Sequence, residues 1–79
     1  MWSLLRLAHD HGSVTENLRV RLFNTKDEAV NAFLVEIVGY RHRNEITHQQ
    51  AIRVMNEIEA TDHAWFGELE WEIRPVVPE

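Results

Sequence analysis

Two histidines near the start of the chain have a spacing that suits metal binding. His9 and His11 flank Asp10 in the run His9-Asp10-His11-Gly12, and on an extended backbone side chains two residues apart project to the same side. Imidazole nitrogens are common ligands of Zn²⁺ and Ni²⁺. No third ligand stands at a recognised spacing, and the candidates for that position are His48, Asp62 and His63.

A metal-binding or small enzymatic domain that uses His9 and His11 therefore remains an alternative. The favoured interpretation is a turn around Gly12, in which Asp10 and His11 form hydrogen bonds and His9 ends a strand. On this interpretation we expect no bound metal and no cofactor.

The other residue types give little support for catalysis. The chain has no cysteine, which excludes thiolate nucleophiles, disulfides and cysteine-based zinc sites and is typical of a reducing compartment. Two of its few hydroxyl groups, on Thr25 and Thr47, are expected to cap helices, and its carboxylates fall on faces expected to be solvated. Its three scattered glycines form no phosphate-binding loop. We therefore expect a protein that is not an enzyme.

Two adjacent aromatic residues are the best sign of a binding surface. Trp65 and Phe66 point to opposite sides of any extended backbone, so only one of them enters the core easily. The other is a candidate anchor, because tryptophan and arginine often dominate the energetics of interfaces. The alternative is that both aromatic side chains are buried under the helix ends. The predicted partner-binding residues are Trp65, Phe66, Arg19, Arg21, Glu68, Glu70 and Glu72. They would make the uncovered face of a sheet the docking surface for another protein.

The elements that must position these residues begin with two strands. Residues 2–9 are apolar enough for a strand, and residues 18–23 alternate apolar with basic side chains, which is the pattern of a half-buried strand. The alternation predicts opposite directions for the two kinds of side chain: Leu18, Val20 and Leu22 inward, Arg19 and Arg21 outward.

Two helices and a closing strand should follow. Each helix is opened by a capping box, Thr25-Lys26-Asp27-Glu28 for a helix over residues 26–41 and Thr47-His48-Gln49-Gln50 for a helix that ends near residue 60. Residues 68–74 alternate strictly and predict a strand with three glutamates outward. Its inward side chains are Leu69, Trp71 and Ile73.

This order predicts an α+β fold of the type β-β-α-α-β, with a three-stranded, mostly antiparallel sheet and both helices packed on one face. Residues 1–79 should form a single domain, with residues 75–79 as a frayed tail. The strand order stays open. Arginines opposite glutamates favour direct pairing of the second strand with the closing one, whereas the strongly apolar first strand favours a central position for itself. The second arrangement is preferred.

Size and charge limit the partners. A chain of 79 residues needs nearly all its long apolar side chains for one small core, which favours binding over catalysis. Its 13 acidic and 8 basic residues give a net charge of -5, which argues against direct nucleic-acid binding. No apolar run is long enough for a membrane span, and no signal-peptide pattern is present. We expect a cytoplasmic protein with a protein partner and no membrane contact; a homodimer would hide apolar side chains of the open sheet face.

Two stretches of the sequence carry a resemblance. The first strand ends in His-x-His-Gly within Leu5-Arg6-Leu7-Ala8-His9-Asp10-His11-Gly12, and a second strand leads into Thr25-Lys26-Asp27-Glu28-Ala29. With helices and a closing strand rich in Glu and Trp, this resembles a pattern in short uncharacterised proteins of bacteria and of their phages and plasmids. The resemblance implies the β-β-α-α-β fold and no established activity, so it assigns no functional residues. Small acidic proteins of such elements often inhibit host machinery stoichiometrically, anti-CRISPR proteins among them.

The leading expectation is therefore a non-enzymatic protein-binding domain, of the kind that a mobile element encodes to inhibit a host complex, in the anti-CRISPR or another anti-defence class. The alternatives are the metal-binding or small enzymatic domain that uses His9 and His11, and a structural homodimer.

Overall fold

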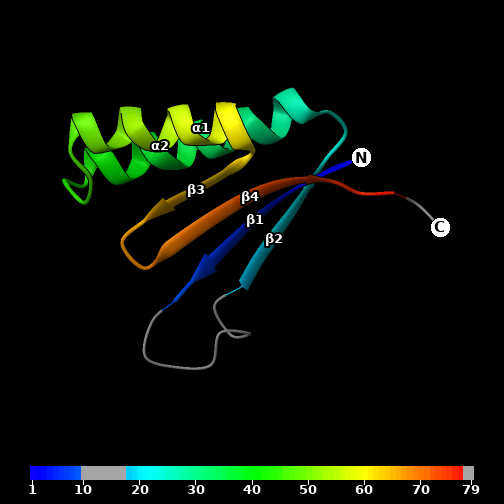
Figure 1. The fold of residues 1–79 in the computed structure, drawn as a ribbon, viewed down its shortest axis with the longest axis horizontal. Coiled ribbons are helices and arrows are strands. Elements are labelled where there is room, and N and C mark those ends of the chain that lie inside the picture. The colour runs from blue at the N-terminus through cyan, green and yellow to red at the C-terminus, as the bar shows by residue number, and fades with distance from the viewer. Residues whose placement is uncertain (10–17, 78–79) are drawn as a thin grey trace.

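Two helices lie side by side on one face of a four-stranded antiparallel sheet (Figure 1). The structure is a computed structural model, and it describes residues 1–9 and 18–77. The elements in chain order are β1 (Trp2–Ala8), β2 (Leu18–Phe23), α1 (Lys26–His42), α2 (His48–Thr61), β3 (His63–Phe66) and β4 (Leu69–Pro75). The α+β class, the antiparallel sheet and the placement of both helices on one face are confirmed, but the prediction of three strands is wrong.

The additional strand, β3, is the short first arm of a hairpin. Its four residues pair antiparallel with β4, from His63 opposite Glu72 to Phe66 opposite Leu69. Gly67 turns the chain with a φ of 57°, a left-handed conformation that glycine adopts without a steric penalty. Four residues are too few to display a strand period, so the sequence showed only the longer arm.

The sheet order is β2-β1-β4-β3. The preferred internal position of the first strand is thus correct, and direct pairing of the second strand with the closing strand is wrong, because β1 lies between β2 and β4. The physical reason is visible in β1 itself. Leu4 is buried under the helices, while Leu5 and Leu7 lie on the opposite face, and a strand that is apolar on both faces suits an internal position.

The prediction for the two faces of β2 is also wrong. Arg21 pairs with Leu4 and Val20 with Leu5, so the arginines lie on the helix side of the sheet. The apolar side chains of β2 therefore point to the open side and are about half exposed: Leu18 49%, Val20 51% and Leu22 59%. Period-2 alternation divides a strand into two faces, but it does not say which face the helices cover.

The helices begin at the predicted caps. Thr47 and Gln50 form a complete capping box, with the Gln50 amide donating to Thr47 Oγ1 at 3.2 Å and the Thr47 amide donating to Gln50 Oε1 at 3.0 Å. At α1 only half of the box is present. The Glu28 amide donates to Thr25 Oγ1 at 3.2 Å, while the Thr25 hydroxyl lies 3.3 Å from the Glu28 carboxylate.

The core lies between the helices and the middle of the sheet. Trp71 of β4 is fully buried, and its ring meets Phe33 of α1 edge to face at 5.5 Å between ring centroids. Inward-facing Leu69, Trp71 and Ile73 match the prediction for the closing strand. None of the helices in residues 1–9 and 18–77 is both long and apolar enough to cross a membrane.

The end of the chain stays paired beyond the point where fraying was expected. Pro75 is the last residue of β4, and the Val76 amide donates to the Met1 carbonyl at 2.8 Å. The rest of the expected tail, residues 78 and 79, lies outside the described part of the chain.

Candidate protein-binding surfaces on the sheet

The face of the sheet opposite the helices is half apolar. Val20 lies opposite Leu5, and Leu18 lies opposite Leu7, across the β1–β2 ladder. We call this surface the apolar half, and it consists of Leu5, Leu7, Leu18, Val20 and Leu22. Both helices of the described residues lie on the other side of the sheet (Figure 1), and the apolar side chains of β2 are about half exposed.

The other half of the same face is polar and is organised around one carboxylate. One carboxylate oxygen of Glu70, on β4, forms a 2.9 Å hydrogen bond with Nε2 of His9, which directly follows β1. The other oxygen forms a hydrogen bond with Nε2 of His63 on β3. Hydrogen bonds from His9 and then from His63 hold the pKa of Glu70 below its ordinary value, against a smaller opposing effect of burial. The carboxylate thereby ties three strands together.

Trp65 covers this cluster. Its indole stacks on the His9 ring with 5.0 Å between centroids and meets the His63 ring edge-on at 5.7 Å, yet 44% of the residue is exposed. We call the surface formed by His9, His63, Trp65, Glu70 and Glu72 the polar half. In this half the partly exposed indole of Trp65 packs against two histidines that are already hydrogen-bonded to Glu70.

Of the histidine pair that offered an alternative metal site, the structure describes His9. His9 is directed at Glu70, and His63, one of the expected third ligands, binds the same carboxylate. His11 lies outside the described residues. Among the residues that are described, no group of three or more histidine, cysteine or acidic side chains is arranged to hold a metal ion.

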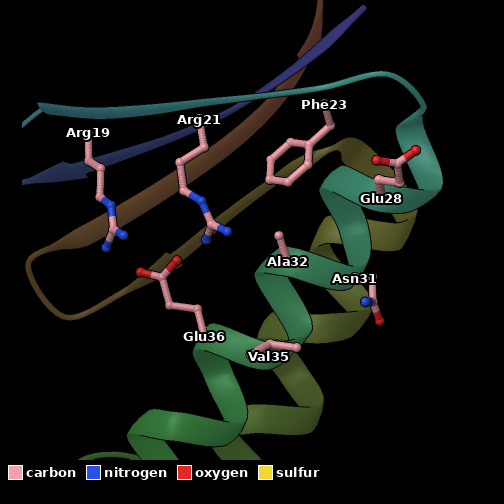
Figure 2. Close-up of a pocket in the computed structure, with 8 residues that line it drawn as sticks. All are labelled: Arg19, Arg21, Phe23, Glu28, Asn31, Ala32, Val35 and Glu36. Atoms are coloured by element: carbon pink, nitrogen blue, oxygen red, sulfur yellow. The ribbon is translucent and has the colours of Figure 1, made fainter.

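A second surface lies on the helix side, between β2 and α1. It is a groove of about 490 Å³, here called the β2–α1 groove, lined by Arg19, Arg21, Phe23, Glu28, Asn31, Ala32, Val35 and Glu36. Figure 2 shows Arg19 and Arg21 extending from β2 towards α1, with the Glu36 side chain rising from α1 to face them. Arg21 also lies over the Phe23 ring, 5.3 Å from its centroid.

A third arginine stands beside this groove. Arg6 of β1 lies opposite Arg19 in the ladder, and its guanidinium binds Glu36 and the Tyr40 hydroxyl, each at 3.2 Å. Glu36 is therefore already engaged by Arg6.

Comparison with protein-family models, with curated proteins and with solved structures finds no match for this chain.

The structure divides the predicted partner-binding residues among different places. Trp65, Glu70 and Glu72 share the open face, whereas Arg19 and Arg21 lie in the groove on the other side of the sheet. Phe66 packs against the core, which leaves Trp65 as the outward member of the aromatic pair, and Glu68 lies in the hairpin turn.

The sequence interpretation expected apolar side chains of the first strand on the open face, but it missed the contribution of β2 because it assigned the β2 side chains to the core. A signal was available in β1, where Leu4, Leu5 and Leu7 provide apolar side chains to both faces of one strand. Two helices on one side can cover only one of those faces.

Proposed function

We propose that this chain is a non-enzymatic protein-binding domain that docks through the open face of its sheet. One observation carries the proposal: Leu18, Val20 and Leu22 are each about half exposed on one face of β2. Val20 and Leu18 lie directly opposite Leu5 and Leu7 of β1. Contiguous apolar surface of this kind is typical of interaction sites. Its removal from water stabilises a complex by roughly 25 cal/mol for each Å² buried.

The polar half supplies the features that orient a partner. Trp65 presents a large, partly exposed ring, which is a frequent interface anchor. The carboxylate beneath it is fixed by two imidazoles, and a preorganised group loses little conformational freedom when a partner binds. An apolar contact area beside a rigid polar one matches the general anatomy of protein interfaces.

A narrower proposal concerns the class of partner. The resemblance to short proteins of phages and plasmids, together with the acidic composition, supports an inhibitor encoded by a mobile element that acts on a host complex, in the anti-CRISPR or another anti-defence class. Its support is the sequence pattern around His9 and Thr25, and the docking face is the surface that such an inhibitor would use.

Capture from a bacterial lysate tests the broader proposal when it is run with matched variants. The triple variant Leu18→Thr, Val20→Thr, Leu22→Thr removes apolar surface from β2 and keeps the branched or polar character that edge strands tolerate. The control is Val38→Thr, Ile52→Thr, which alters two exposed apolar side chains of the helices outside the groove between β2 and α1. We expect the original chain and the control to retain the same proteins and the triple variant to lose them.

Retention of the same proteins by all three chains would show that the open face is not the docking surface. A defence or regulatory complex among the specifically retained proteins would support the narrower proposal, and its absence from a lysate that contains such complexes would count against it.

Self-association is the second candidate, because the apolar half could equally be covered by a second copy packed face to face. Sedimentation equilibrium over a wide concentration range separates the two. A dimer that the triple variant abolishes would identify a structural homodimer, and a monomer at every concentration would leave the heterologous partner as the explanation.

A further inference from the structure

The two edges of the sheet are treated differently by the rest of the fold. At the β3 edge, the Trp65 amide donates to Glu57 Oε2 at 3.3 Å, and the His63 carbonyl accepts from Thr61 Oγ1 at 3.0 Å. Both side chains come from α2, so this helix satisfies backbone groups that would otherwise template another strand.

The backbone groups that β2 presents at the opposite edge can be identified from the register. The Val76 amide donates to the Met1 carbonyl, and Pro75, which has no amide proton, lies opposite Trp2. Because the two sides of a strand alternate, the backbone groups of Trp2, Leu4 and Arg6 therefore face β2.

The partners of these three residues on β2 are Phe23, Arg21 and Arg19. The amides and carbonyls of Leu18, Val20 and Leu22 consequently point away from β1, in the plane of the sheet. No described group outside β1 bonds to the backbone of these residues. In the described part of the chain, β2 is the edge without a protecting contact.

The charges beside this edge are unbalanced. Arg6 and Arg19 are directly opposite one another in the ladder, and like charges in that position are destabilising. Glu36 binds Arg6, and neither Arg19 nor Arg21 forms an ion pair with a described residue. On a chain with a net charge of -5, the helix side of this edge thus carries two arginines without an ion pair to a described residue, in a groove that Glu28 of α1 also lines.

We infer that the outer edge of β2 binds an extended segment of the protein partner as a fifth strand, in which acidic and apolar residues alternate. The acidic side chains of that segment lie over the β2–α1 groove and pair with Arg19 and Arg21. Its apolar side chains lie on the open face and extend the apolar half. Addition of a strand to a free edge is an established mode of peptide recognition, and the inference rests on the proposed protein-binding function.

Charge complementarity selects this occupant over a second copy of the chain. Antiparallel pairing of β2 with β2 of another copy, in one continuous sheet, would place arginine side chains against arginine side chains. The same repulsion would be relieved by a strand that carries carboxylates on that face.

A labelled peptide provides the direct test. The probe is a fluorescein-labelled, end-blocked octapeptide in which glutamate and valine alternate, measured by fluorescence anisotropy at physiological salt. One comparator replaces each glutamate with lysine, and another has the same composition with the glutamates in one block. We expect saturable binding of the alternating glutamate peptide, and affinities at least about tenfold lower for both comparators. Equal affinity for the lysine peptide, or no binding of the glutamate peptide, would overturn the inference.

Two variants of the protein locate the site. Arg19→Glu with Arg21→Glu should weaken binding at least about tenfold, whereas Arg41→Glu, an exposed arginine outside the groove lining, should have little effect. Val20→Pro removes the outward-facing amide proton of residue 20, which β1 does not use, and an edge strand tolerates proline at such a position. Val20→Pro should bind the peptide more weakly than its matched control, Val20→Thr. Unchanged binding by the arginine variant would overturn the assignment.

A modified peptide tests strand addition without changing the protein, so this test holds even if Val20→Pro unfolds the domain. N-methylation of alternate amides of the glutamate peptide, in either of the two possible phases, removes one set of ladder donors. Loss of binding in one phase only is the expected result for strand addition, and equal binding in both phases would exclude it.

The lysate experiment separates this inference from the function on which it rests. If the triple threonine variant loses the captured proteins but Arg19→Glu with Arg21→Glu retains them, the docking face stands and strand addition fails. If neither variant changes capture, the proposed function fails.

Discussion

At the scale of single residues, Glu70 connects the polar half to the stability of the sheet. It accepts hydrogen bonds from His9, which directly follows β1, and from His63 of β3. Those bonds favour the ionised carboxylate, so the pKa of Glu70 in the folded chain lies below its ordinary value of 4.5.

This lowered pKa predicts a pH dependence with a defined sign. A carboxyl group whose pKa is depressed by folding stabilises the native state above its unfolded pKa, and this contribution disappears as the pH falls through the depressed value. For Glu70→Gln we expect a lower free energy of unfolding at neutral pH and a difference from the original chain that shrinks below pH 4.5. Urea denaturation at a series of pH values measures this. Glu68→Gln, in the exposed turn, is the control, and a Glu70→Gln deficit that does not change with pH would contradict the explanation.

Trp71 carries the largest buried side chain of the core, and its ring contacts Phe33 and Tyr40 edge-on. Trp71→Ala should reduce the free energy of unfolding by about 3–5 kcal/mol, the range for large aromatic truncations in cores. Trp71→Phe retains part of the aromatic contact and should cost less. Denaturant titration monitored by far-ultraviolet circular dichroism distinguishes them, and equal losses would argue against the edge-on packing.

At the scale of elements, the sequence was most informative where one local pattern decided the outcome. Thr25 and Thr47 placed the starts of both helices, since a side-chain oxygen followed by a glutamate or glutamine three residues later is a strong N-terminal signal. The strict alternation around Trp71 likewise predicted the buried face of the closing strand. In each case the interactions that determine the structure lie within the element itself or between the element and the core.

The elements that the sequence predicted poorly depend on distant partners. The direction of Arg19 and Arg21 follows from the register of β2 on β1 and from the position of α1, which no pattern within β2 contains. The arm β3 is stabilised by pairing with β4 and by α2, so its short sequence carries no period of its own. The candidate site was therefore predicted only in part. Glu70, one member of the pair Trp65 and Phe66, and some apolar side chains of the first strand were expected on the open face, but the apolar side chains of β2 were not.

Gly67 gives a prediction for the β3–β4 hairpin. Its φ of 57° disfavours a residue with a Cβ atom, while a Cβ built there meets no other atom within 4 Å. Gly67→Ala should therefore cost only the backbone penalty, about 1 kcal/mol, and Gly67→Asn should cost less because asparagine tolerates this conformation better. Thermal denaturation of the two variants tests the order, and a much larger loss for Gly67→Ala would indicate a steric clash.

At the scale of the whole molecule, the helices cover one side of the sheet and leave the other side to solvent. Since Leu18, Val20 and Leu22 are half exposed, their replacement by threonine should change the free energy of unfolding by no more than about 0.5 kcal/mol each. The same replacement should reduce binding of a hydrophobic dye such as anilinonaphthalene sulfonate to the native chain. A large loss of stability would mean that these side chains belong to the core after all.

The bonds from α2 to the β3 edge also have a kinetic consequence. The Trp65 amide proton is held by Glu57, and Thr61 holds the neighbouring His63 carbonyl, so both anchors are lost whenever the final turn of α2 unwinds. In native-state hydrogen–deuterium exchange, Trp65 should then exchange together with the amides of that turn, as one opening unit. Glu57→Gln should accelerate exchange of the Trp65 amide and leave the Trp71 amide protected. This result would show that the end of α2 and β3 open together, separately from the rest of the sheet.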